Sequence, residues 1–200
     1  MVRGNYISSA KVYFNPDAAS EALRSEYLTV YDLLGGGMEI RFALPEERIF
    51  LTLSADYLSR TRSANFFLSI NGVLQRSSGS EGLKFIPVEL GVHTYVPIGA
   101  EDFQLSMGGG IGAYYAVQTL EIFGAKTQVT NSPIAYGIHI NTGLEYRLRS
   151  DIRIRTELTF RDPEVMNENR YEQQSVENPF RTKIQVNGLS LSLGIAVDMF

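Results

Sequence analysis

Side chains of alternating character run through this chain in segments that are longer than ordinary strands. Between residues 102 and 118 the odd positions are mostly apolar, whereas the even positions are small or polar. Successive side chains of a β-strand point to opposite faces, so this period of two predicts a strand with one apolar face. The pattern recurs over about 31–44, 48–60, 84–96, 134–148, 151–161 and 183–199, and more weakly over 2–14. Many of these eight segments reach ten residues, where soluble strands usually have about five or six.

The connections between the segments alternate in length. The short ones are 45–47, 99–101 and 149–150, and the long polar ones are 15–28, 61–82, 119–133 and 162–182. Short turns at one rim and long loops at the other are typical of outer-membrane barrels, whose strands need roughly 9–11 residues to cross the bilayer. The sequence therefore predicts one all-β domain over 1–200, an eight-stranded antiparallel up-and-down transmembrane β-barrel.

An internal repeat supports this interpretation. A glycine followed by a short alternating run recurs at Gly37, Gly91, Gly143 and Gly194, at spacings of 54, 52 and 51 residues. Each unit then holds one up-strand, one loop and one down-strand. Four units give eight strands, with both termini on the side of the short turns.

The polar face of the strands is predicted to line the lumen. It carries Glu39, Arg41, Asp56, Glu89, His93, Glu145, Arg147, Arg153, Arg155, Glu157 and Asp198. Many glycines share this face; an exposed strand gains nothing from them, but in a narrow barrel they leave room for larger neighbours. The apolar face would then contact lipid. A soluble lipocalin-like barrel, which turns its apolar face inward around a ligand, is the alternative.

The charged residues of this face predict a plug, because eight strands enclose a lumen just wide enough for side chains. Arg outnumbers Lys 14 to 4, and Arg suits buried, forked ion pairs better. A turn at 149–151 places Glu145 opposite Arg155 and Arg147 opposite Arg153, so we expect the Glu145 carboxylate to bind Arg155 or Arg153. A conducting path for small solutes is the alternative.

Composition argues against several kinds of site. The net charge of −4 argues against a nucleic-acid partner, and the lack of cysteine excludes thiolate metal sites and a Cys nucleophile. With two histidines, neither a metal nor another cofactor is expected. His93 and Ser106 could face each other as in a lipid-modifying enzyme, but both lie near the short-turn rim, away from the outer leaflet. We therefore predict no catalytic residue and keep the enzyme as an alternative.

One region carries a family resemblance. The run from Tyr136 to Arg147, a tight turn, and the run from Ile152 to Glu157 resemble the final hairpin region of outer-membrane β-barrels of the OmpA, OmpX and opacity-protein kind. The terminal Phe200 is similar to their C-terminal aromatic residue, although Asp198 stands where that family prefers an apolar side chain.

The resemblance implies a small non-enzymatic protein of the bacterial outer membrane that acts in envelope structure or through its loops. It implies outer-membrane lipid and the barrel assembly machinery as partners, a protein partner at the long loops, and a signal peptide that has been removed.

Two further expectations concern the wall of the barrel. Leu105, Ile111, Ile140, Leu158 and Leu193 should contact lipid. The first and last strands should pair between about 4–12 and 188–198, because a barrel is closed only if they do. In the first strand we expect Tyr6, Ala10, Val12 and Phe14 to face lipid and Arg3, Asn5, Ser9 and Lys11 to face inward, with Arg3 close to Asp198.

Overall fold

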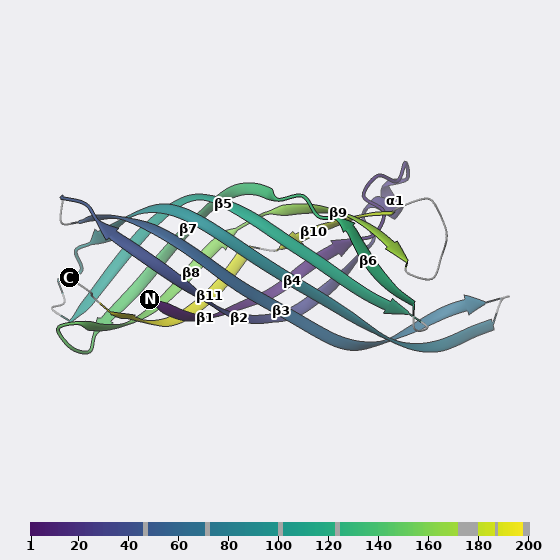
Figure 1. Ribbon diagram of the computed structural model, residues 1–200, viewed down its shortest axis with the longest axis horizontal. Helices are drawn as coiled ribbons and strands as arrows, with labels where there is room; N and C mark the ends of the chain where they lie inside the picture. Colours follow the sequence, from purple (N-terminus) through teal and green to yellow (C-terminus); the bar gives the residue numbers. More distant parts are fainter. Residues whose placement is uncertain are drawn as a thin grey trace.

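The alternating segments form the wall of a barrel. The computed structural model describes residues 1–45, 48–70, 73–99, 102–122, 125–171, 180–186 and 188–197. Its elements are β1 (Val2–Tyr13), α1 (Glu21–Arg24), β2 (Tyr27–Ala43), β3 (Ile49–Ile70), β4 (Val73–Val96), β5 (Phe103–Ile122), β6 (Ala125–Asn131), β7 (Ala135–Arg147), β8 (Ile152–Arg161), β9 (Glu164–Tyr171), β10 (Phe180–Val186) and β11 (Gly188–Val197). In Figure 1 the strands run obliquely around a long axis, as closure of a sheet requires.

Three of the barrel strands are each interrupted once, so these elements make eight barrel strands. β6 continues into β7 after residues 132–134, β8 into β9 after residues 162–163, and β10 into β11. Each barrel strand pairs antiparallel with the next. β1 closes the barrel by pairing with β11 from Val2 to Ile7 and with β10 from Ala10 to Tyr13. The predicted eight-stranded antiparallel barrel is therefore confirmed, and so is pairing between the first and last strands.

The two ends of the barrel differ in their connections. β1 begins and β11 ends toward the left in Figure 1, at the end where β2 is followed by β3, β4 by β5, and β7 by β8 after short connections. We call this the short-turn end. At the opposite end, the outer end, strands extend beyond the barrel body, and the β3–β4 hairpin reaches furthest.

Three of the four predicted long loops contain long stretches of strand. Residues 61–82 belong almost entirely to the β3–β4 hairpin, whose ladder continues to Ile70 and Val73. Within 119–133 lie the end of β5 and all of β6, within 162–182 lie β9 and the start of β10, and 15–28 contains α1. The sequence suggested loops because these segments are rich in polar residues. Backbone pairing does not depend on side-chain polarity.

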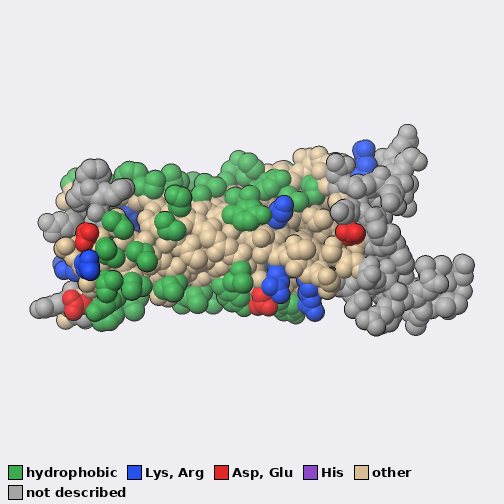
Figure 2. Space-filling view, turned by 60° about the horizontal axis from the view of Figure 1, so that its bottom comes forward, with side chains coloured by type: hydrophobic (Ala, Val, Ile, Leu, Met, Phe, Trp, Pro, Cys, Tyr) green, Lys and Arg blue, Asp and Glu red, His purple; other side chains and the backbone are tan. Residues whose placement is uncertain are grey.

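Apolar side chains cover the outer surface of the barrel body. Ile111, Ile140, Leu158 and Leu193 are exposed on the wall as predicted, and Leu105 is half-buried. Figure 2 shows hydrophobic side chains over the left and middle of one face, with charged groups toward the short-turn end and nearer the outer end. Exposed aromatic residues border this band, as is typical of membrane barrels: Phe42, Phe103 and Tyr146 at the short-turn end, and Tyr57, Tyr115, Tyr136 and Phe160 toward the outer end. Within the described residues, no helix is long and apolar enough to cross a membrane.

The first strand reverses its faces halfway along. Up to Ile7 the odd positions point inward, but beyond it Ala10 and Val12 are buried inside and Phe14 packs against the same core. The β1–β2 ladder skips the opposed pair Ser8 and Asp32, and Asp32 has a left-handed φ of 58°. A local irregularity of this kind turns the following side chains to the other face. The expectation that Ala10, Val12 and Phe14 face lipid is therefore wrong.

Candidate functional site

Arg3 lies at the centre of a buried ionic network in the half of the lumen nearer the short-turn end. Its Nη2 and Nε atoms lie 2.8 and 2.9 Å from the two carboxylate oxygens of Asp56. Its Nη1 atom lies 2.9 Å from Glu39 Oε2 and 3.2 Å from Glu157 Oε1. These acids come from β3, β2 and β8, so one guanidinium on β1 joins four barrel strands. Forked guanidinium–carboxylate bonds of this kind combine strength with fixed geometry.

Glu145 is a second centre of the network. Its Oε1 atom lies 2.6 Å from Arg155 Nη1, and the same oxygen is ion-paired with Arg41. Arg153 Nη1 lies 4.0 Å from Oε2. Arg155 also binds Glu157, and Arg41 Nε donates to Glu39 at 2.6 Å, so the two centres are connected. The predicted register, in which Glu145 faces Arg155, is present.

A third centre forms around Glu89, further from the short turns. Arg161 Nε lies 2.9 Å from Glu89 Oε1, and the Tyr114 hydroxyl donates to the same oxygen at 3.0 Å. The His139 Nδ1 atom lies 3.9 Å from it. Across the three centres, five carboxylates face five guanidinium groups: Glu39, Asp56, Glu89, Glu145 and Glu157 against Arg3, Arg41, Arg153, Arg155 and Arg161. The ion pairs are thus balanced in charge.

Glycines give the large lumen side chains their space. A Cβ added to Gly143 would lie 2.8 Å from Arg155 Cζ, and one added to Gly112 would lie 2.4 Å from the Tyr114 hydroxyl oxygen. The guanidinium and the phenol ring therefore lie directly on the backbone of β7 and β5. This is the role that the sequence suggested for glycines on the polar face.

An apolar layer fills the lumen on the outer side of the ionic network. Its members all point inward and are buried: Ile7, Ala10, Val12, Val30, Leu33, Leu58, Leu83, Phe85, Tyr114, Ala116, Val165, Ile184 and Val186. Phe85 and Tyr114 stack, with their ring centroids 6.0 Å apart. Two successive layers, one ionic and one apolar, therefore occupy the described lumen.

Nine of the eleven side chains predicted for the lumen lie in or beside the ionic network. They are Glu39, Arg41, Asp56, Glu89, His93, Glu145, Arg153, Arg155 and Glu157. Arg147 is exposed at the short-turn end, where its direct cross-strand neighbour is Arg153. Two like charges placed opposite each other repel, which favours a solvated position for one of them. Asp198 lies outside the described residues, and so does its expected contact with Arg3.

Sequence reasoning missed two cations of the network. Arg3 was expected to bind Asp198, but its described partners are Asp56, Glu39 and Glu157. Arg161 was not assigned to the lumen, although the alternation that placed Arg153 and Arg155 inward applies to it equally. The cross-strand partners could not be found because they depend on how far the strands are staggered around the barrel.

The possible hydrolase pair is not assembled. Ser106 donates to the Gly143 carbonyl at 3.3 Å, and its cross-strand neighbour is Tyr95. His93 lies opposite Gly108, and its Nε2 atom lies 3.0 Å from Thr52 Oγ1. A nucleophile and its base need to be within hydrogen-bond reach of each other, and these two groups bond elsewhere.

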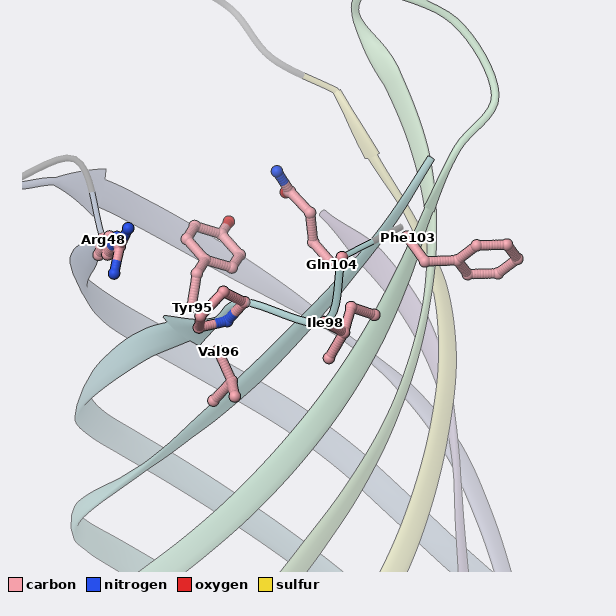
Figure 3. A pocket seen from close by; sticks show the side chains of 8 residues that line it. Arg48, Tyr95, Val96, Ile98, Phe103 and Gln104 are labelled. Atoms are coloured by element: carbon pink, nitrogen blue, oxygen red, sulfur yellow. The ribbon is translucent and has the colours of Figure 1, made fainter. Parts of the chain in front are cut away.

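A small open pocket of about 300 Å³ lies at the short-turn end, between the ends of β4 and β5. It is lined by Arg48, Tyr95, Val96, Pro97, Ile98, Gly99, Phe103 and Gln104. In Figure 3 Phe103 points away from the pocket, whereas Tyr95 and Gln104 stand at its mouth. Tyr95 packs on Phe50 at 4.8 Å, and Arg41 lies 5.2 Å from that ring. The pocket-lining Tyr95 therefore lies beside Arg41, a member of the ionic network.

Comparison with known proteins gives relatives in fold alone. No protein-family model matches the chain, and no curated protein matches it in sequence. Among solved structures it is similar to the outer membrane protein OprG from Pseudomonas aeruginosa, with a TM-score of 0.60 and 12% identity over 98% of this chain and 94% of that one. It is also similar to Neisserial surface protein A, with a TM-score of 0.51 and 8% identity over 98% and 96%.

The attachment invasion locus protein Ail of Yersinia pestis matches at a TM-score of 0.51 and 12% identity over 98% of this chain and 95% of that one. These neighbours are outer-membrane barrels of eight strands, like the barrel described above. The chain therefore has the fold of the eight-stranded transmembrane β-barrels of the bacterial outer membrane.

Proposed function

We propose that this chain is a non-enzymatic outer-membrane protein that binds a protein partner at its outer end, through an open strand edge of the β3–β4 hairpin. The observation that carries the proposal is the unequal length of the ladders around β3. Pairing of β3 with β4 continues to Ile70 and Val73, whereas its pairing with β2 ends at Leu34 and Ser59. The hairpin therefore projects beyond the barrel body, as Figure 1 shows at the right.

The projecting part of β3 leaves one row of backbone groups unpaired. Among the described residues, 60–70 of β3 pair with β4 on one side and with no strand on the other. Among the described residues, 27–33 of β2 pair with β1 and not with β3. β2 and β3 therefore diverge here. An open edge is a template for another strand, and an extended peptide can add to it by main-chain hydrogen bonds. The fitting partner is an extended segment of another protein.

The two filled layers of the lumen support this function over a channel. An ionic network and an apolar layer follow each other along the axis, so a solute would have to displace buried ion pairs and a packed core. The occupied hydrogen bonds of Ser106 and His93 argue in the same way against a hydrolase. What remains accessible at the outer end is strand and loop, and this favours recognition over transport or catalysis.

Photo-cross-linking tests the proposal. A photoreactive amino acid at Arg62, exposed beside the open edge, should capture a protein on cells, whereas the same group at the lipid-facing Tyr136 should capture none. The captured protein, once purified, should lose binding to a variant in which Asn-Gly joins Ser63 to its cross-strand neighbour Ser80. Unchanged binding to this shortened hairpin would refute the proposal, because the barrel body is retained.

A second candidate function is the passage of small apolar molecules between the lumen and the bilayer. It is favoured by a seam in the wall: backbone pairing of β7 with β8 ends at His139 and Arg161, and pairing of β6 with β9 resumes at Asn131 and Glu168. Side chains bridge this region, since Ser132 Oγ and Asn167 Nδ2 both donate to the Ala116 carbonyl, at 3.0 and 2.9 Å. Residues of the apolar layer lie directly behind it.

The seam is tested by removing its side-chain bonds. If apolar molecules enter here, the double variant Ser132→Ala, Asn167→Ala should speed the entry of a small apolar dye into liposomes that contain the protein. Equal rates for the variant and the wild type would exclude this route and leave partner binding as the function.

A further inference from the structure

We propose that His93 and His139 make the lumen seal sensitive to acid. The two rings come from β4 and β7 and meet over the glycines of β5 that lie between those strands. Gly91 on β4 faces Gly110 on β5, which in turn faces His139 on β7. A Cβ added to Gly91 would lie 2.9 Å from His93 Nε2 and 3.2 Å from His139 Nε2. The Nε2 atoms of the two rings therefore flank one point inside the lumen. Both side chains are almost fully buried.

The surroundings of His93 offer no spare negative charge. Its ring stacks on Phe50 at 5.1 Å, and its Nε2 atom contacts Thr52. The charged groups that act on it are Glu39 and Arg41 of β2, and Arg155 and Glu157 of β8. Each of those two carboxylates already binds two guanidinium groups. A proton on His93 therefore adds a positive charge to a set of ion pairs that is already balanced.

His139 couples the ionic network to the apolar layer. The charged groups that act on it are Glu89 of β4, Arg161 and Glu157 of β8, and Arg3 of β1. Glu89 holds Arg161 and also accepts the hydrogen bond from Tyr114, the largest ring of the apolar layer. A protonated His139, whose Nδ1 lies 3.9 Å from Glu89, competes with Tyr114 for this carboxylate. Withdrawal of Glu89 leaves the buried phenol without its acceptor, so a change in the ionic layer reaches the apolar one.

Acid therefore acts on both layers at once. Histidine is the side chain that changes charge closest to neutral pH, and buried neutral histidines must take up protons when a protein is acidified. Two imidazolium groups that flank one point repel each other. Water that enters the lumen would screen this repulsion. The closed lumen is thus the state of two neutral rings, and protonation favours a hydrated lumen in which the rings have separated.

Planar-bilayer recordings of the full chain between pH 7.5 and pH 3.0 test this inference. The wild type should be silent at pH 7.5 and conduct increasingly on acidification, by about tenfold per pH unit for each proton taken up over the titration range. His93→Gln and His139→Gln should each weaken this pH dependence, and the double variant should lose it. Asn141→Gln, a polar lumen substitution on the same strand as His139, should keep the wild-type response. A wild type that stays silent throughout, or a double variant that responds like the wild type, overturns the proposal.

A second measurement does not depend on any variant folding. The chain has only two histidines, so NMR spectra of a histidine-labelled sample in nanodiscs contain two imidazole signals. Both should report protonation over the same pH interval in which conductance appears. Conductance that rises while the rings remain neutral contradicts the proposal, because another group must then be the sensor.

Discussion

Single side chains matter most where one charge serves several partners. Arg3→Met leaves Asp56, Glu39 and Glu157 in the lumen without their shared cation, and uncompensated buried charge is costly. We expect a loss of about 3–5 kcal/mol in the free energy of unfolding, measured by urea titration of the protein folded in lipid vesicles. The matched control is Arg147→Met, which removes an exposed guanidinium and should change stability by less than about 0.5 kcal/mol. Equal effects for the two variants would contradict the central place of Arg3.

A second residue-scale prediction concerns Glu81, which lies on β4 outside the lipid-facing band. Burial raises the pKa of its carboxyl above the ordinary value, and the Arg62 guanidinium partly opposes this. The folded protein then holds the proton more tightly than the unfolded chain, so the contribution of Glu81 to stability falls as the pH rises above about 4.5. Glu81→Gln should therefore become more favourable relative to wild type between pH 4 and pH 7, measured by urea unfolding. A Glu81→Gln variant whose stability relative to wild type is the same at pH 4 and pH 7 would contradict this prediction.

At the scale of strands, alternation was informative wherever one face meets lipid. Ile140 and Leu193 were placed on the outside and Glu145 and Arg155 on the inside from their parity alone, because one register buries a whole face. The same rule failed at Ser8 and Asp32, where a left-handed residue reverses the faces of β1. Residues 61–82 were predicted as a loop because they are rich in polar residues, although Ala64, Phe66, Leu68 and Ile70 share one parity. The reversal of β1 arises from backbone geometry that side-chain polarity does not record, whereas the alternation within the hairpin was present in the sequence and was overlooked.

Substitution on β7 tests the lipid-facing assignment of a strand. Ile140→Arg places a guanidinium in the middle of the exposed apolar band and should destabilise the barrel by about 2–4 kcal/mol. Tyr136→Arg, four residues closer to the outer end on the same face of β7, should cost only about 0–1 kcal/mol. Unfolding titrations in vesicles measure both variants. Similar losses at the two positions would mean that the band does not span the membrane as described.

For the whole molecule, the closed ladder and the apolar surface predict its behaviour in detergent. We expect the folded protein to need detergent or lipid to stay in solution, because its outer surface is apolar. On a denaturing gel it should migrate differently when it has not been heated, since a barrel held by a continuous ladder resists detergent at room temperature. A chain that is monodisperse in detergent-free buffer would contradict contact between this apolar surface and lipid.

The position of Arg3 also determines when folding can be completed. Its partners Glu39, Asp56 and Glu157 follow it by 36, 53 and 154 residues along the chain. Arg3 therefore cannot bind all its partners until the seventh barrel strand has been synthesised, and the ladder of β1 is completed only by the last strand. Contacts this distant in sequence are slow to form. A barrel that still lacks its seventh strand leaves charge in the lumen unpaired. This disfavours insertion of the unfinished wall into lipid.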